Sequence, residues 1–153
     1  MTGGARGLGL VQVEALIEAG AEAVFAFDRL PTPEPRFGEL KKMYPDQHLD
    51  YKQVDVTDAD SLKPAFKAVA DFKGRLDGLV AAAGIQHEAP ALDYTAQDCR
   101  RILDVNVFPC TELFAEVGYW SLSLRSSSGR ANDSDKVRRI HNPDRKHVGN
   151  YCK

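Results

Sequence analysis

A glycine-rich run at the very start of this 153-residue chain constrains its fold more than any other feature. Residues 2–9 read TGGARGLG and follow directly on Met1. Gly3 can take a positive φ in a tight turn, while Gly7 and Gly9 carry no Cβ where a phosphate group and the neighbouring backbone must approach closely. Such a loop normally follows a β-strand, and no strand precedes it here. The run therefore indicates a dinucleotide-binding fold without its first strand.

The residues after the loop support a dinucleotide site. A helix over residues 8–19 would point the free N–H groups near Leu8 at the phosphates. Residues 23–27, AVFAF, predict a strand that ends on Asp28. Asp28 lies 19 residues beyond Gly9, close to the spacing at which an acidic residue hydrogen-bonds the adenosine ribose. The alternative is a surface aspartate that begins a loop, and the spacing favours the ribose role.

The remaining pattern alternates strands and helices, as in α/β proteins with a parallel sheet. We expect residues 1–117 to form a partial Rossmann-like, doubly wound domain in which the first strand and the C-terminal half are missing. Thr95 and Asp98 predict a capping box at the last helix. The sequence predicts, in order, a helix at 8–19, a strand at 23–27, a short helix ending before Pro45, a strand at 50–55, a helix at 59–72 with Pro64 near its first turns, a strand at 77–83 and a helix from 95 that Pro109 kinks or ends.

Four motifs, in order and spacing, resemble the short-chain dehydrogenase/reductase family over residues 2–107. TGGARGLG matches the TGxxxGxG cofactor loop of that family, and VDVT brings Asp55 to the position that touches the adenine. AAAG at 81–84 stands where the family has Asn-Asn-Ala-Gly, and LDVNV brings Asn106 to the position of a catalytic asparagine. The resemblance implies these cofactor-binding residues: Gly3, Arg6, Gly7, Leu8, Gly9, Asp28, Arg29, Asp55, Val56, Ala82, Ala83 and Gly84.

Some of these positions keep a structural alternative or depart from the family pattern. Asp55 could be a solvated carboxylate at a strand end, and Asn106 could be a helix asparagine that bridges a kink or a water molecule. Ala81 and Ala82 remove the two amide side chains that normally brace the loop and the cofactor. The alanine and glycine that follow still allow the backbone to approach closely.

The catalytic pair of the family, a Tyr with a Lys four residues later, is missing. In the family the Tyr exchanges the proton and the Lys lowers the pKa of that Tyr. Only Asn106 is carried over as a catalytic residue. The resemblance implies an NAD(P)-dependent oxidoreductase, acting on an alcohol or ketone, that is inactive as this chain. The fourth residue after each Tyr gives the pairs Tyr44 and His48, Tyr51 and Asp55, Tyr94 and Asp98, and Tyr119 and Ser123, while Tyr151 is too near the end.

The choice of cofactor depends on charge. Asp28 would repel a 2′-phosphate and hydrogen-bond a free ribose hydroxyl, which favours NAD. Arg6 and Arg29 could pair with a 2′-phosphate, which would favour NADP. Because the aspartate occupies the deciding position, we expect NAD, with NADP as the alternative.

The substrate and the partner are suggested by resemblance alone. The stretches GGARGLGLVQVEALIEAGA and AAAGIQHEAPALDYT resemble polyol dehydrogenases of the sorbose-reductase and arabinitol-dehydrogenase type. The alternative function is a non-catalytic nucleotide-binding remnant. A further alternative is that the chain pairs with a full-length homologue, or forms a homo-oligomer, through the helix that carries Asn106.

Composition changes after residue 117. Residues 1–117 hold 12 Lys plus Arg and 19 Asp plus Glu, whereas residues 118–153 hold 8 and 3. The tail is basic, rich in Ser and poor in apolar residues, which predicts disorder. The abrupt change, like the missing strand, is typical of a gene-model artefact. No aromatic residue interleaves with the tail's main arginine cluster, and acidic residues interrupt its charge, so we expect no nucleic-acid binding.

Metal and membrane sites are not indicated. The 3 cysteines and 4 histidines lack the spacing of metal ligands. The longest apolar run, residues 79–83, is far too short to span a bilayer, and the first residues do not read as a signal peptide. We therefore expect no metal, no membrane association and a cytoplasmic location.

Overall fold

The centre of the fold is a parallel sheet of two strands in the part of the chain that the computed structural model describes, residues 1–109, 113, 115, 117 and 118. Strand β1 (Ala23–Asp28) pairs with β2 (His48–Gln53), from Ala23 opposite His48 to Asp28 opposite Gln53. The predicted position of β1 is confirmed to within one residue. Strand β2 begins and ends two residues earlier than predicted, because its pairing with β1 starts at His48 and the chain then turns towards Asp55.

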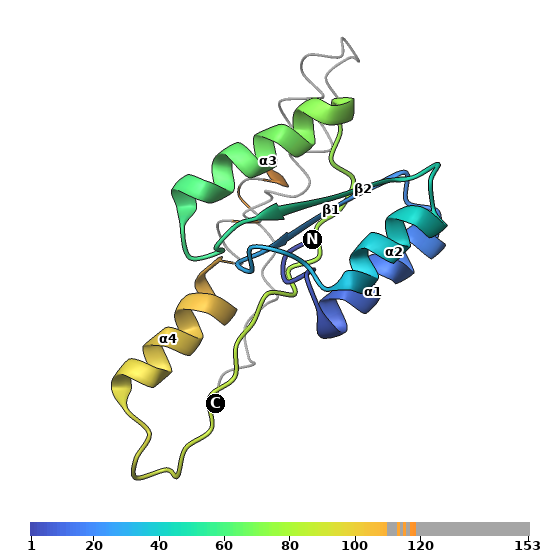
Figure 1. Ribbon diagram of the computed structural model, residues 1–153. Helices are drawn as coiled ribbons and strands as arrows, with labels where there is room; N and C mark the ends of the chain where they lie inside the picture. The colour runs from blue at the N-terminus through green and yellow to red at the C-terminus, as the bar shows by residue number, and fades with distance from the viewer. Residues whose placement is uncertain (110–112, 114, 116, 119–153) are drawn as a thin grey trace, which may run out of the picture.

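Helices lie on both sides of this sheet, which confirms the α/β prediction (Figure 1). Two of them cover one face, a third covers the other, and the fourth lies apart from the sheet. Pro64 lies on the exposed side of the third helix, in its second turn, where it removes one backbone hydrogen bond from the helix. The helices are α1 (Gly7–Glu18), α2 (Pro35–Met43), α3 (Ala59–Lys73) and α4 (Ala96–Asn106).

Alternate side chains of β1 enter two separate cores. Val24 and Ala26 point towards α1 and α2, where they join a buried cluster with Leu10, Val13 and Leu40. On the opposite face, Phe27 joins a cluster that α3 supplies, with Leu62, Ala65, Phe66 and Val69. Because successive strand residues face opposite sides, the apolar run of β1 is what allows helices to pack on both faces.

Helix α1 ends at Glu18, one residue before its predicted end, and Gly20 closes it. Gly20 has φ of 88°, its N–H donates to the carbonyl of Ile17 at 3.0 Å, and the N–H of Ala21 donates to the carbonyl of Leu16 at 3.0 Å. This is the Schellman arrangement, in which a left-handed glycine closes the helix. It turns the chain directly into β1.

Met1 and Thr2 lie between β1 and the segment around Ala81. Thr2 forms isolated parallel bridges with Phe27 and with Ala81. The N–H of Phe27 donates to the carbonyl of Met1 at 2.8 Å, and the N–H of Thr2 donates to the carbonyl of Val80 at 2.9 Å. Met1 and Thr2 therefore pair with both neighbouring segments at the place where the first strand was expected to be missing.

The prediction of a strand at 77–83 is wrong, because this segment forms no continuous strand. Apart from the bridge at Ala81, this segment has no strand pairing in the described residues. Its partner there is Thr2 alone, and a single pair of residues does not build a ladder.

No helix in the described ranges has the length and apolar character needed to cross a membrane. The predicted tail, apart from Gly118, lies outside the described residues, as do Tyr119 and Tyr151.

The buried amino group of Met1 predicts a pH dependence of stability in a polypeptide that begins at this residue. Burial lowers the pKa of this group from 8.0 to about 6, and the group donates to the carbonyl of Phe25 at 2.6 Å. Between these two pKa values the unfolded state binds more protons than the folded state, so stability rises with pH. We expect the free energy of unfolding to fall by about 2 to 3 kcal/mol from pH 8 to pH 6, at about 1.4 kcal/mol per pKa unit.

Urea denaturation at pH 6, 7 and 8 measures this dependence. The matched control is the same chain acetylated at Met1, which keeps every histidine but loses the titrating amine. An equal slope in the two chains would assign the dependence to other groups.

Candidate functional site

The glycine-rich loop packs closely against the start of helix α1 and against Ala82. Gly3 has φ of 71°, and a Cβ there would lie 2.8 Å from the carbonyl oxygen of Ala82. A Cβ on Gly9 would lie 1.8 Å from the carbonyl oxygen of Gly3. These two positions therefore require glycine. Helix α1 has no side-chain cap and no acidic residue in its first turn, so its N–H groups remain available to an anion.

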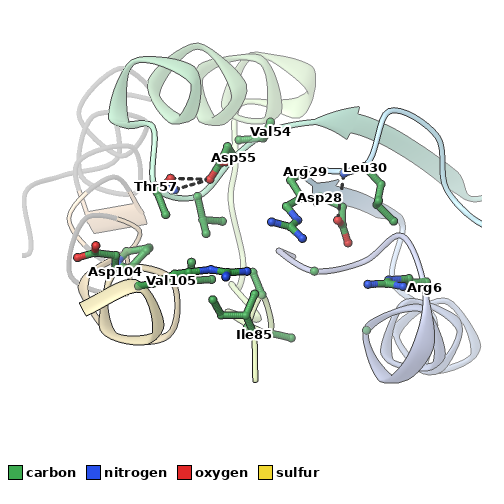
Figure 2. Close-up of a pocket in the computed structure, with 18 of the residues that line it drawn as sticks. Arg6, Asp28, Arg29, Leu30, Val54, Asp55, Thr57, Ile85, Asp104 and Val105 are labelled. Carbon is green, nitrogen blue, oxygen red and sulfur yellow. Dashed lines mark hydrogen bonds between the residues drawn. The ribbon is translucent and has the colours of Figure 1, made fainter. Parts of the chain in front are cut away.

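A cleft of about 1170 Å³ lies beyond the carboxyl ends of β1 and β2. Figure 2 shows Arg6 on the glycine-rich loop at one side, Asp104 and Val105 of α4 at the other, and Asp28 and Arg29 along the edge between them. All of the cofactor-binding residues expected from the sequence line this one cleft: Gly3, Arg6, Gly7, Leu8, Gly9, Asp28, Arg29, Asp55, Val56, Ala82, Ala83 and Gly84.

Asp28 ends β1 and ties two loops together. Its Oδ2 accepts from the N–H of Ala5 at 3.1 Å, and its Oδ1 accepts from the N–H of Leu30 at 3.2 Å. Both carboxylate oxygens are thus held, and each retains capacity to accept a further hydrogen bond. The carboxylate lies in the cleft, as the role at the ribose needs. An aspartate that only begins a surface loop would not have to lie there.

Asp55 is exposed and follows β2. It accepts hydrogen bonds from Thr57, at 2.9 Å from the backbone N–H and 2.7 Å from Oγ1 (Figure 2). These bonds lower the pKa of Asp55, first through the backbone N–H and then through the hydroxyl, and the positive charge of Arg29 adds to the effect. The group is therefore a carboxylate at neutral pH, oriented by Thr57.

Asn106, the expected catalytic residue, turns its side chain to the backbone of Ile85. Its Oδ1 accepts from the N–H of Ile85 at 2.8 Å, and its Nδ2 donates to the carbonyl of the same residue at 2.9 Å. This contact joins the end of α4 to the segment after Gly84. A Cβ on Gly84 would lie 3.4 Å from the same Oδ1.

Helix α4 supplies cleft residues that the sequence reasoning missed. The predicted capping box forms, since Asp98 N–H donates to Thr95 Oγ1 at 3.1 Å and Thr95 N–H donates to Asp98 Oδ2 at 3.3 Å. None of the helix residues is buried. Spacing by three and four residues would have placed the missed side chains on one helical face. They are Gln97, Arg100, Arg101, Asp104 and Val105.

The chemistry that the cleft offers is charge and hydrogen bonding. Its described lining contains aspartate, glutamate and arginine side chains but no Tyr, Lys or His. It can hold an anion against backbone N–H groups and accept hydroxyl hydrogen bonds at carboxylates.

Comparison with known proteins matches residues 1–130 to short chain dehydrogenase. A 3alpha-hydroxysteroid dehydrogenase of Mediterraneibacter gnavus is 30% identical over 120 residues, covering 76% of this chain and 48% of that protein. Galactitol 2-dehydrogenase of Rhizobium johnstonii is 37% identical over 118 residues, covering 74% and 45%. A short-chain type dehydrogenase/reductase structure from Mycobacterium ulcerans superposes with a TM-score of 0.68 at 28% identity, covering 76% and 43%. The chain thus spans less than half the length of these relatives.

Proposed function

The chain belongs to the short chain dehydrogenase family, and on that premise we propose that its cleft binds NAD in preference to NADP. The observation that carries this proposal is that the residues expected to bind the cofactor, far apart in the sequence, line a single cleft. Relatives in this family use NAD(P), and the volume of the cleft, about 1170 Å³, leaves room for a dinucleotide.

The residues present fit the parts of a dinucleotide. The uncapped N–H groups at the start of α1 would hold the pyrophosphate beside Gly7 and Gly9. Asp28 would accept from the adenosine ribose, and Asp55 with Val56 would contact the adenine. The backbone of Ala82 and Ala83 lies close to Gly3, and these two residues with Gly84 would lie along the cofactor. When bound, the nicotinamide ring supplies the hydride chemistry of the family.

For the protein as a whole we propose hydride transfer with an alcohol or ketone, and a polyol as the substrate class. The similarity to galactitol 2-dehydrogenase and to the L-2,3-butanediol dehydrogenase of Corynebacterium glutamicum, 36% identical over 110 residues, supports a polyol. The amino-acid sequence contains no Tyr that is followed four residues later by a Lys. As the chain stands, we therefore propose binding without efficient turnover, with Asn106 as a residue of the catalytic set. The alternative function is a non-catalytic one, in which the chain pairs with a second chain through α4.

Replacing Asp28 by Asn tests the preference for NAD. A hydrogen bond to a charged group contributes about 1.5 to 3 kcal/mol, so the Kd for NAD should rise about tenfold or more. Removal of the negative charge should leave the Kd for NADP unchanged or lower. Isothermal titration calorimetry with each dinucleotide measures both constants.

The matched control is Asp46→Asn, an exposed aspartate that does not line the cleft. It should leave both constants as in the unaltered chain. Tighter binding of NADP than of NAD by the unaltered chain would contradict the preference, and binding of neither would contradict the function.

A further inference from the structure

We propose that Tyr51 and Gln53 are positioning residues that fix the loop after β1, and through it the carboxylate of Asp28, so that they set the preference between NAD and NADP. The inference rests on the proposed function. Neither side chain lines the cleft, so both would act on the cofactor through the loop at 28–30.

Tyr51 and Gln53 reach this loop from the neighbouring strand. They are two residues apart in β2, so their side chains leave the strand on the same face. The hydroxyl of Tyr51 donates to the carbonyl of Leu30 at 2.5 Å and lies 3.5 Å from the carbonyl of Asp28. Nε2 of Gln53 donates to the carbonyl of Arg29 at 3.0 Å. Each carbonyl of the loop is therefore within reach of a donor from β2.

The same loop residues hold the carboxylate. The N–H of Leu30 donates to Oδ1 of Asp28 at 3.2 Å, while its carbonyl accepts from Tyr51. Oδ2 of Asp28 accepts from the N–H of Ala5 in the glycine-rich loop at 3.1 Å. Leu30 is thus the link between the Tyr51 hydroxyl and the carboxylate, and the carboxylate is the link to the phosphate-binding loop.

The ring of Tyr51 is held independently of its hydroxyl. It packs edge-on against Phe37, with ring centroids 5.7 Å apart and planes at 73°. Burial, and then the negative charge of Asp28, raises the pKa of Tyr51, so its hydroxyl stays a donor at neutral pH. Phenylalanine would keep the packing and remove only the donor.

Tyr51→Phe separates positioning from packing. In the cofactor-binding experiment, we expect the Kd for NAD to rise about fivefold to tenfold, equivalent to about 1 to 1.4 kcal/mol. The Kd for NADP should change less, so that the ratio of the two constants falls. Gln53→Met should act in the same direction with a smaller effect, because Gln53 is exposed.

Two matched controls lie shortly before β2 in the sequence. Tyr44 is half-buried against the same core cluster, and in the described residues its hydroxyl makes no hydrogen bond. Gln47 donates from Nε2 to the carbonyl of Ile17 at 2.8 Å, outside the cleft. Tyr44→Phe and Gln47→Met should leave the ratio of the NAD and NADP constants unchanged, whatever they do to the melting temperature.

Amide hydrogen exchange of the ligand-free chain gives a second readout that does not depend on cofactor binding. Tyr51→Phe should speed exchange at Leu30 and Ala5, and Tyr44→Phe should not. Unchanged exchange at both amides would overturn the positioning role, even if the chain binds neither dinucleotide. Faster exchange with an unchanged ratio of constants, in a chain that binds NAD, would overturn the role in cofactor preference. Failure of the proposed function itself would appear separately, as absence of binding by the unaltered chain.

Discussion

Gly9→Ala is expected to destabilise the chain by about 3 kcal/mol or more, the upper part of the range for overpacked cores. The added Cβ would lie 1.8 Å from the carbonyl oxygen of Gly3 and 2.7 Å from its carbonyl carbon. Both are backbone atoms, and Gly3 is itself held at a φ of 71° between Gly9 and Ala82. The clash can be relieved only by moving the loop, so the affinity for NAD should be lost together with stability. Urea denaturation and calorimetry with NAD measure the two effects.

Gly38→Ala is the matched control for this change. Gly38 is also inside a helix, α2, but it is exposed and a Cβ there meets no atom within 4 Å. Alanine is favoured over glycine in helix interiors by about 0.5 to 1 kcal/mol, so this variant should be slightly more stable than the unaltered chain. Equal stability of the two variants would show that α1 and the loop are not packed as described.

The local elements of the fold could be read from the sequence because local chemistry determines them. The end of α1 follows from Gly20, which can adopt the left-handed conformation that closes a helix. The start of α4 follows from Thr95 and Asp98, whose side chains satisfy the first N–H groups. β1 follows from an apolar run that ends on Asp28. In each case the residues that determine the element lie within it or next to it.

The elements that differ from the prediction depend on residues far away in the chain. Strand β2 starts at His48 because that residue lies opposite Ala23, a pairing that no pattern within residues 50–55 reveals. The segment at 77–83 has a strand-like composition, but pairing needs a partner, and the described chain offers only Thr2. The cleft face of α4 was missed for the same reason, since an exposed helix with polar residues gives no local sign of what it faces.

The residues expected to bind the cofactor line one cleft, and their roles stay a prediction, whereas part of the sheet was predicted wrongly. The motifs do not reveal which other residues hold these site side chains in place. Tyr51 holds the loop of Asp28 through a hydrogen bond between residues far apart in the sequence, and the register of β1 against β2 decides that contact. Thr57 orients Asp55 locally, from two residues further along the chain.

The chain of 153 residues is expected to bind NAD and yet to oxidise polyols about 10² to 10⁴ times more slowly than a relative with the Tyr and Lys pair, the usual contribution of a positioned acid or base. In the described residues the proton-accepting side chains that line the cleft are the carboxylates of Asp28, Glu34, Asp55 and Asp104. Hydrogen bonds from Thr57 lower the pKa of Asp55, which makes it a weaker base still. The described lining therefore offers the proton of the reacting hydroxyl no Tyr, Lys or His side chain as an acceptor.

Absorbance of NADH during incubation with NAD and a panel of polyols, including galactitol, measures this rate, with galactitol 2-dehydrogenase as the active reference. Calorimetry on the same preparation shows whether NAD is bound, so that absence of turnover is not confused with absence of binding. A rate within tenfold of the reference would contradict the prediction. Phenylalanine variants of Tyr44 and Tyr94 would then test whether one of these hydroxyls transfers the proton, because the variant of the true donor would lose the rate while keeping the affinity for NAD.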